Sequence, residues 1–332
     1  MDINLDIGIP TTPSGMAGEM PSEFDVVIIG GGPAGLTAAL YTSRARLRTL
    51  IIEKLAIGGQ VILTNEVEDY PGIERVAGVE LIKVMEKQAR NFGSYIISDA
   101  IEKIQDMDNG KKSIKTKSGR EITAYAVIVA VGAAHRQLGV KNEVRLRGKG
   151  VSYCGVCDGA FFRNMEIAVI GGGDTAAEES VFLTRFAKKV YLIHRRDRLR
   201  AAKMLQERAL SNAKIQPIFD TVVEEIEGEK AVEKIKLKNI KTNRQSELIV
   251  QGVFIFVGLF PNTEFLAGYM DLTAEGYIKA DEDMGTQKPG IFAAGDCVDK
   301  KFRQIVTAAG DGAIAAYSAQ HYVEHLKGTE YV

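Results

Sequence analysis

The stretch that decides the fold spans residues 23–53 and reads EFDVVIIGGGPAGLTAALYTSRARLRTLIIE. Its apolar run at residues 26–29 predicts a buried parallel strand, because such strands are covered on both faces. A glycine-rich turn follows, then an apolar helix is expected over about residues 33–44, then a second strand ending at Glu53. This order of strand, turn, helix and strand predicts an α/β domain with a parallel sheet.

The glycine turn carries the pattern G-x-G-x-x-G, formed by Gly30, Gly32 and Gly35. Between a strand and a helix, the first glycine makes the tight turn, the second lets the backbone approach a pyrophosphate, and the third lets the helix pack on the strand. The helix N-terminus favours the phosphates. Glu53, 18 positions after Gly35, is placed to accept a hydrogen bond from a ribose hydroxyl. A merely structural turn would need none of this context, so we expect a dinucleotide site.

A second copy of the unit follows 141 positions later, where Gly171, Gly173 and Ala176 form G-x-G-x-x-A. The predicted strand at residues 167–170 and the predicted helix over about residues 175–186 flank this turn in the same order. One chain with two such turns indicates two bound dinucleotides.

The strand expected after the second turn ends in basic residues instead of an acid: His194, Arg195 and Arg196, with Arg200 just beyond. A run of charges is usually only a solvated surface. At this position, however, arginines suit the 2′-phosphate of NADP(H), which a carboxylate would repel. At about 1.5–3 kcal/mol for each charged hydrogen bond, two arginines favour NADPH over NADH by roughly a hundredfold. We therefore assign FAD to the first turn and NADPH to the second.

Between the two turns lies VSYCGVCDGAFF, which contains a Cys-x-x-Cys pair, Cys154 and Cys157. Such a pair can be a redox centre, part of a zinc site or a structural disulfide. A zinc site would need His321 and His325, more than 160 positions away, whereas local zinc modules are much more compact. A disulfide that closes so short a loop constrains the unfolded chain little. A redox pair between two nucleotide sites is favoured, and no metal is expected.

Composition limits the class of protein. The 332 residues carry 42 Lys and Arg against 43 Asp and Glu, a formal net charge of −1, so no nucleic-acid partner and no membrane surface is expected. No apolar run is long enough to span a bilayer. Residues 1–22 do not resemble a signal peptide and are expected to be a flexible extension. Three cysteines suit a reducing cytoplasm better than a disulfide scaffold.

The motif order predicts the domain organisation. We expect an α/β fold with two Rossmann-like, three-layer dinucleotide-binding domains, the second inserted into the first. The FAD domain is expected over residues 23–135 and 264–332, and the NADPH domain with the cysteine pair over residues 136–263.

From Phe24 to the C-terminus the chain resembles the thioredoxin reductases of low molecular weight from bacteria and archaea. The resemblance rests on six motifs in order: GGGPAGLTAALYTSRA, GGQVILTNEVEDYPG, YCGVCDGAFF, GGGDTAAEES, HRRDRLRA and AAGDCVDKKFRQIVTAAGDGAIAA. It implies a homodimeric FAD enzyme that passes electrons from NADPH through its own disulfide to thioredoxin. Another carrier as acceptor, such as a glutaredoxin-like protein or a peroxiredoxin system, is the alternative. A non-enzymatic sensor of the two nucleotides would not need the Cys-x-x-Cys-Asp sequence.

The resemblance also implies roles for single residues. Cys157 resembles the cysteine beside the flavin, Cys154 the one that attacks the partner's disulfide, and Asp158 the acid that moves a proton. Asp296 resembles the acid that binds the ribityl chain. The residues expected to contact FAD are Gly30, Gly32, Pro33, Ala34, Gly35, Glu53, Gly59, Gln60, Gly132, Gly295, Asp296, Arg303, Gln304 and Ile305, and those expected to contact NADPH are Gly171, Gly173, Asp174, Thr175, Ala176, His194, Arg195, Arg196 and Arg200.

Overall fold

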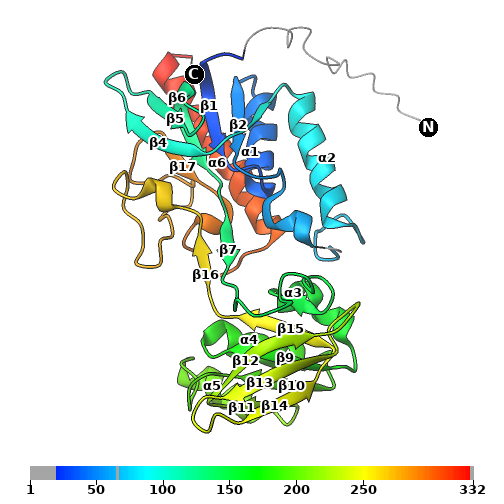
Figure 1. Ribbon diagram of the computed structural model, residues 1–332. Coiled ribbons are helices and arrows are strands. Elements are labelled where there is room, and N and C mark those ends of the chain that lie inside the picture. Colours follow the sequence, from blue (N-terminus) through cyan, green and yellow to red (C-terminus); the bar gives the residue numbers. More distant parts are fainter. Residues whose placement is uncertain (1–19, 65–66, 330–332) are drawn as a thin grey trace, which may run out of the picture. The chain divides into compact units, whose positions relative to one another are not determined.

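The computed structural model describes residues 20–64 and 67–329, so most of the expected N-terminal extension lies outside the described residues. The chain divides into two compact units (Figure 1). Described residues up to Ala134 and from Phe260 onward form the first unit, and His135–Leu259 form the second. The two crossings between the units are the short strands β7 (Ala133–His135) and β16 (Leu259–Pro261).

The first unit is built on a seven-stranded sheet. Five strands are parallel, in the order β3, β2, β1, β6 and β17, and an antiparallel pair, β5 and β4, continues from the first half of β6. The bounds are β1 Glu23–Ile29, β2 Thr49–Glu53, β3 Tyr95–Ser98, β4 Ile101–Asp106, β5 Lys112–Thr116, β6 Glu121–Val129 and β17 Ile291–Ala293.

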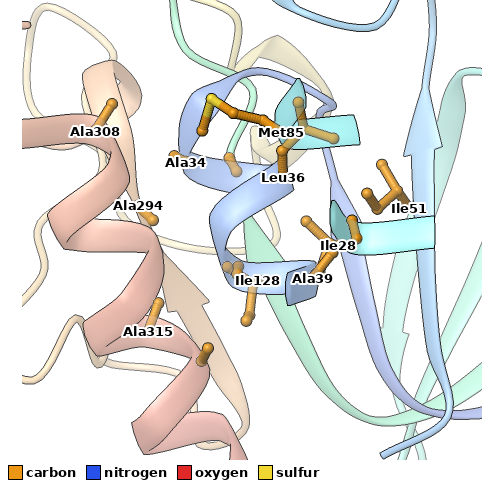
Figure 2. Close-up of a cluster of buried hydrophobic side chains, with 14 of the residues drawn as sticks. Ile28, Ala34, Leu36, Ala39, Ile51, Met85, Ile128, Ala294, Ala308 and Ala315 are labelled. Atoms are coloured by element: carbon orange, nitrogen blue, oxygen red, sulfur yellow. The ribbon is translucent and has the colours of Figure 1, made fainter. Parts of the chain in front are cut away.

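Side chains of β1 alternate between two buried cores, as the pleat of a strand requires. Val26 and Ile28 pack with the helices, and Val27 and Ile29 pack with the antiparallel strands and the segment before β17 (Figure 2 shows the helical side). The sheet is thus the middle of three layers. The helices are α1 Pro33–Arg44, α2 Gly78–Asn91 and α6 Ile305–Lys327, with short 3₁₀ turns η1 Gly59–Leu63, η3 Glu264–Leu266 and η4 Gly295–Cys297.

Small side chains let α6 approach α1 closely. A Cβ added to Gly312 of α6 would lie 2.2 Å from the carbonyl oxygen of Ala34, so the two backbones touch there. Ala308, Ala315 and Ala319 are buried along the same helix. Although α6 is long, neither it nor any other helix in the described residues combines the length and apolarity that crossing a membrane requires.

The second unit repeats the plan of the first. A five-stranded parallel sheet has the order β11, β10, β9, β15, β8, and a separate antiparallel sheet has the order β12, β13, β14. The bounds are β8 Val151–Ser152, β9 Glu166–Gly171, β10 Lys189–Ile193, β11 Ile215–Ile218, β12 Thr221–Glu227, β13 Lys234–Asn239, β14 Gln245–Ile249 and β15 Gly252–Phe256.

Helices α4 (Asp174–Leu183) and α5 (Lys203–Leu210) cover one face of the parallel sheet, and the antiparallel sheet covers the other. The cysteine pair belongs to a short helix, α3 (Gly155–Asp158), which the 3₁₀ turn η2 (Gly159–Phe162) continues. Helix α4 ends at Leu183, before the expected end at residue 186, because the N–H groups of residues 184–186 donate to carbonyls three residues back instead of four.

Candidate functional site

The first glycine turn joins β1 to α1 with almost no space to spare. A Cβ added to Gly35 would lie 1.9 Å from the carbonyl oxygen of Gly30, and one added to Gly30, where φ is 108°, would lie 2.3 Å from that of Ala130. A Cβ on Gly32, by contrast, would meet nothing within 4 Å. Two glycines therefore serve packing, and the middle one leaves its backbone open for a ligand, as a pyrophosphate needs.

Glu53 lies at this turn, as expected from its place at the end of β2. Its Oε2 accepts a hydrogen bond from the backbone N–H of Gly31 at 2.7 Å, and its Oε1 accepts one from Leu55 at 2.9 Å. These bonds fix the carboxylate beside the turn, and each oxygen keeps a second lone pair for a ribose hydroxyl.

Asp296, in the turn after β17, is the clearest candidate in the first unit for a residue that binds a ligand. Its Oδ1 is buried and has no hydrogen-bond partner among the described residues. Burial raises the pKa of Asp296, although Lys300 and Arg303 lower it. Buried polar atoms are normally satisfied, so an orphaned oxygen implies a donor that a bound molecule brings. A polyhydroxylated chain such as the ribityl group of FAD fits that requirement.

The other residues expected to contact FAD lie in this first unit. A Cβ on Gly59 would be 3.7 Å from Gly32 Cα, so the loop at Gly59 and Gln60 lies against the glycine turn. Gly132 accepts the N–H of Asn262 at 3.1 Å. The side-chain amide of Asn262 donates to the Val131 carbonyl at 2.9 Å. This hydrogen bond joins the segment before β7 to the segment after β16, and sequence reasoning did not predict it.

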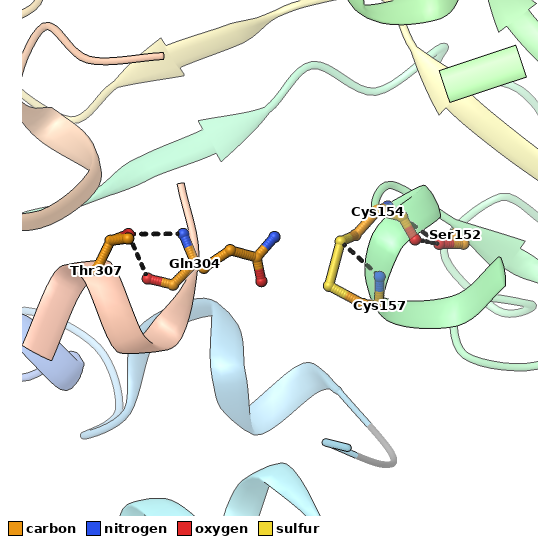
Figure 3. The surroundings of a disulfide bond; sticks show 5 residues. All are labelled: Ser152, Cys154, Cys157, Gln304 and Thr307. Carbon is orange, nitrogen blue, oxygen red and sulfur yellow. Dashed lines mark hydrogen bonds between the residues drawn. A yellow bond between two sulfur atoms is a disulfide. The ribbon is translucent and has the colours of Figure 1, made fainter. Parts of the chain in front are cut away.

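At the start of α6, Arg303 folds back on its own segment. Its guanidinium donates to the carbonyls of Asp296 and Val298 and lies 4.4 Å from the ring centroid of Tyr277. The Gln304 N–H donates to the Thr307 hydroxyl at 3.0 Å, which fixes the first turn of α6 (Figure 3). The N-terminal end of a long helix, beginning at Ile305, is thereby held in a defined conformation, with the partial positive charge that favours an electron-rich group.

In the second unit, Cys154 and Cys157 form a disulfide (Figure 3). The Cys157 N–H points to the Cys154 sulfur at 3.1 Å, and the Ser152 hydroxyl accepts the Cys154 N–H at 3.1 Å. Asp158 follows on the same turn, and its N–H donates to the Cys154 carbonyl at 3.2 Å. The third cysteine, Cys297, is buried, and burial raises the pKa of its thiol to about 12, which makes it a poor nucleophile.

The second glycine turn matches the first in shape. A Cβ on Gly171 would lie 2.4 Å from the Phe256 carbonyl oxygen, whereas one on Gly173 would meet nothing within 4 Å. The carboxylate of Asp174, which begins α4, accepts the N–H of Ala202 at 2.7 Å. Asp174 therefore ties the turn to the loop that carries the arginines.

His194 lies beneath the turn and is buried. A Cβ on Gly172 would be 2.3 Å from the imidazole Nδ1 and Cε1, so the ring packs on the backbone of the turn. Burial lowers the pKa of His194, and the charges of Arg200, Arg196 and Arg195 lower it further, in that order. The ring, favoured in its neutral form, therefore supports the turn.

Those arginines line a pocket of about 360 Å³ in the second unit. Arg195, Arg196 and Arg200 were expected there, and the structure adds residues that sequence reasoning missed. The lining is completed by Asp197, Arg198, Leu199, Asp220, Ile240 and Lys241. The cluster of positive charge suits a phosphate group.

Asp220 explains how a distant hairpin joins this pocket. Its N–H donates to the Arg196 carbonyl at 3.0 Å, its carbonyl accepts the Ile240 N–H at 2.7 Å, and its carboxylate pairs with Lys241 at 3.0 Å. The loop between β13 and β14 is thus bound to the arginine loop. Lys241 offsets the negative charge that Asp220 brings to a site built for an anion. The sequence holds no signal for this contact, because the hairpin lies some forty positions from the arginines.

Comparison with known proteins shows which family the chain belongs to. Residues 24–312 match the family described as pyridine nucleotide-disulphide oxidoreductase. The chain belongs to this family, and within it to the thioredoxin reductases. It is 50% identical over 307 residues to a thioredoxin reductase of Listeria innocua, covering 92% of this chain and 95% of the relative. It is 48% identical to one of Bacillus subtilis, covering 92% and 96%.

A solved structure agrees. The crystal structure of thioredoxin reductase from Streptococcus pyogenes aligns with a TM-score of 0.88 at 45% identity, covering 92% of this chain and all of the other. The predicted family and the predicted fold of two Rossmann-like domains are confirmed. The predicted class, a flavoprotein oxidoreductase of the thioredoxin reductase type that uses FAD and NADPH, is confirmed by the same relatives. The roles of individual residues stay predictions.

Proposed function

We propose that this protein reduces oxidised thioredoxin with electrons from NADPH, through a flavin held by the first unit and the Cys154–Cys157 disulfide of the second. One observation carries the proposal: a disulfide closed between Cys154 and Cys157 lies in the same unit as an arginine-lined pocket. A purely structural disulfide would need neither the pocket nor the second glycine turn.

The residues at each glycine turn indicate which nucleotide each unit binds. The first unit has a carboxylate at its turn and an unsatisfied acid, Asp296, so it holds FAD. The second has arginines after its turn, so it holds NADPH by the 2′-phosphate. FAD held at the first turn would supply the two-electron chemistry that connects NADPH to the disulfide.

The chain's own residues carry the remaining steps. Reduction breaks the S–S bond and leaves a thiol and a thiolate. Cys154, as the attacking residue, forms a mixed disulfide with thioredoxin, and Cys157 then displaces it, which restores the internal disulfide and releases thioredoxin as a dithiol. Asp158 moves a proton between the sulfurs and solvent.

Two further features belong to the proposal. A free thiol at Cys297 and a total of three cysteines suit a reducing cytoplasm.

The resemblance to the family supports a homodimer, and exposed apolar side chains on α6, Ile314 and Tyr317, offer a surface for it. Light scattering on the purified protein tests this point and should give twice the chain mass of 36.2 kDa.

The decisive experiment follows NADPH oxidation by the purified protein with candidate thioredoxins, with NADH as the matched control. The protein should be yellow, and turnover should require both NADPH and a thioredoxin. A colourless protein without affinity for FAD, or turnover only with a glutaredoxin-like or peroxiredoxin acceptor, contradicts the proposal.

A further inference from the structure

Helix α4 places a carboxyl group against the backbone of the cysteine turn. A Cβ added to Gly155, the residue after Cys154, would lie 2.0 Å from Oε2 of Glu179 and 3.5 Å from Cγ of Leu183. Glu179 therefore occupies the space that a side chain at position 155 would fill. Because Gly155 lies between the two cysteines, this carboxyl group sits directly against the Cys-x-x-Cys loop.

One oxygen of this carboxyl group, Oε2, has no polar partner among the described residues. Oε2 of Glu179 is buried and makes no hydrogen bond with any described residue. Burial, and to a smaller extent the negative charge of Glu178, raise the pKa of Glu179 to about 7. Burial of one carboxylate oxygen without a donor disfavours the charged form, so near neutral pH Glu179 changes easily between its neutral and charged forms.

Other ionisable groups on the elements packed against Glu179 bear on the same charge. The α3 turn and its N-cap carry the two cysteines and Asp158, and α4 itself carries Glu178 and, in its first turn, Asp174. The remaining charged residues on neighbouring elements are Lys203, Glu207 and Arg208 on α5, Glu166 on β9 and Lys189 on β10. Glu166 is already bound to Lys188 and to the Tyr191 hydroxyl. The charge gained on reduction arises on the cysteine sulfurs, beside Gly155.

We propose that Glu179 is a positioning residue that controls the charge of the reduced cysteine pair: it is protonated whenever the pair carries a thiolate. The proposal deepens the proposed function and rests on it, because it concerns the dithiol that this function uses. Two electrons and one proton convert the disulfide into one thiol and one thiolate. If Glu179 is charged at that moment, it takes up a second proton from solvent, because two negative charges at one turn repel.

The test measures the thiolate directly. Holoenzyme is reduced with a chemical dithiol, which is then removed, and the alkylation of Cys154 and Cys157 by iodoacetamide is followed from about pH 6 to pH 9 by mass spectrometry. The variant Glu179→Gln removes the charge and keeps the shape. Glu178→Gln, an exposed neighbour on the same helix, is the matched control.

We expect Glu179→Gln to lower the apparent pKa of the reactive thiol, because the repelling charge is gone. Alkylation should be about three- to tenfold faster near pH 7.5. It should converge with that of the unaltered protein below about pH 6, where the side chain at position 179 is neutral in both proteins. Glu178→Gln should leave the profile within about twofold. A Glu179→Gln profile that superimposes on the unaltered one, or an equal shift in Glu178→Gln, overturns the proposal.

Two further measurements separate an effect of the charge of Glu179 from an effect of its packing. Glu179→Met, apolar and of similar size, should shift the profile in the same direction as Glu179→Gln; opposite shifts would mean that packing, not charge, is responsible. In the unaltered protein the profile should be broader than a single titration, since the two groups are coupled, and a single simple titration contradicts the coupling. None of these readouts uses NADPH or thioredoxin, so their failure is distinguishable from failure of the proposed function.

Discussion

In the first unit the strand after the glycine turn ends in Glu53, whose carboxylate accepts the backbone N–H of Gly31 in the middle of the turn. In the second unit the equivalent strand is followed by His194, whose ring packs on Gly172 in the middle of its turn. Two side chains thus occupy equivalent places under equivalent backbones. One is an acid, and the other is a neutral ring that leads into a group of arginines. The backbone makes the same kind of glycine turn in both cases, and we propose that the residues at the strand end select the nucleotide.

The two turns also differ in how tightly the helix closes on the strand. The third position of the motif is Gly35 in the first unit, where an added Cβ would lie 1.9 Å from a carbonyl oxygen. In the second unit it is Ala176, whose methyl group is fully buried. The first turn therefore has no room for a methyl group at this position, whereas the second turn holds one.

The largest expected effect comes from removing the disulfide, which only the second unit contains. Cys157→Ser should lower thioredoxin-dependent turnover by about a thousandfold or more, because a hydroxyl cannot take part in disulfide exchange. Flavin content and the reduction of flavin by NADPH should persist, since no group of the first unit is altered. Stopped-flow absorbance of the flavin and steady-state NADPH oxidation measure the two properties. Retained turnover would refute the role assigned to Cys157.

A pair of opposite substitutions at the third motif position tests the difference in packing. Gly35→Ala should lower the free energy of unfolding of the first unit by about 3 kcal/mol, because the methyl group meets backbone and not a flexible side chain. Ala176→Gly should cost the second unit only about 1–2 kcal/mol, from helix propensity and one lost buried methyl group.

Urea unfolding measures both changes, with flavin release reporting on the first unit and far-ultraviolet circular dichroism on the whole chain. Equal losses in the two variants would show that the third position is not what distinguishes the turns.

The smallest expected effect concerns the preference of the second unit for NADPH over NADH. Arg195→Ala combined with Arg196→Ala should raise KM for NADPH by up to about a hundredfold and KM for NADH only slightly, because NADH lacks the 2′-phosphate. Steady-state kinetics with each nucleotide measure the ratio. If both KM values rise equally, the arginines support the loop and do not read the phosphate.

Much of the site could be predicted because its signals are local. A glycine turn, the strand before it and the helix after it lie within some thirty residues, and β1, α1 and Glu53 are where the pattern placed them. The cysteine pair and the arginine run were equally visible. The pattern did not predict that His194 would support its turn from below, because burial of a strand-end side chain depends on what packs over it.

Local order determined the two glycine turns, their flanking strands and helices and the redox pair, since each depends on neighbours in the chain. Tertiary structure alone decided the rest. It brought the hairpin residue Lys241 to the arginine-lined pocket through Asp220, left Oδ1 of Asp296 without a partner among the described residues, and set Glu179 against Gly155. The physical reason is that burial and charge pairing depend on distances between elements remote in sequence, and no spacing pattern in the chain records those distances.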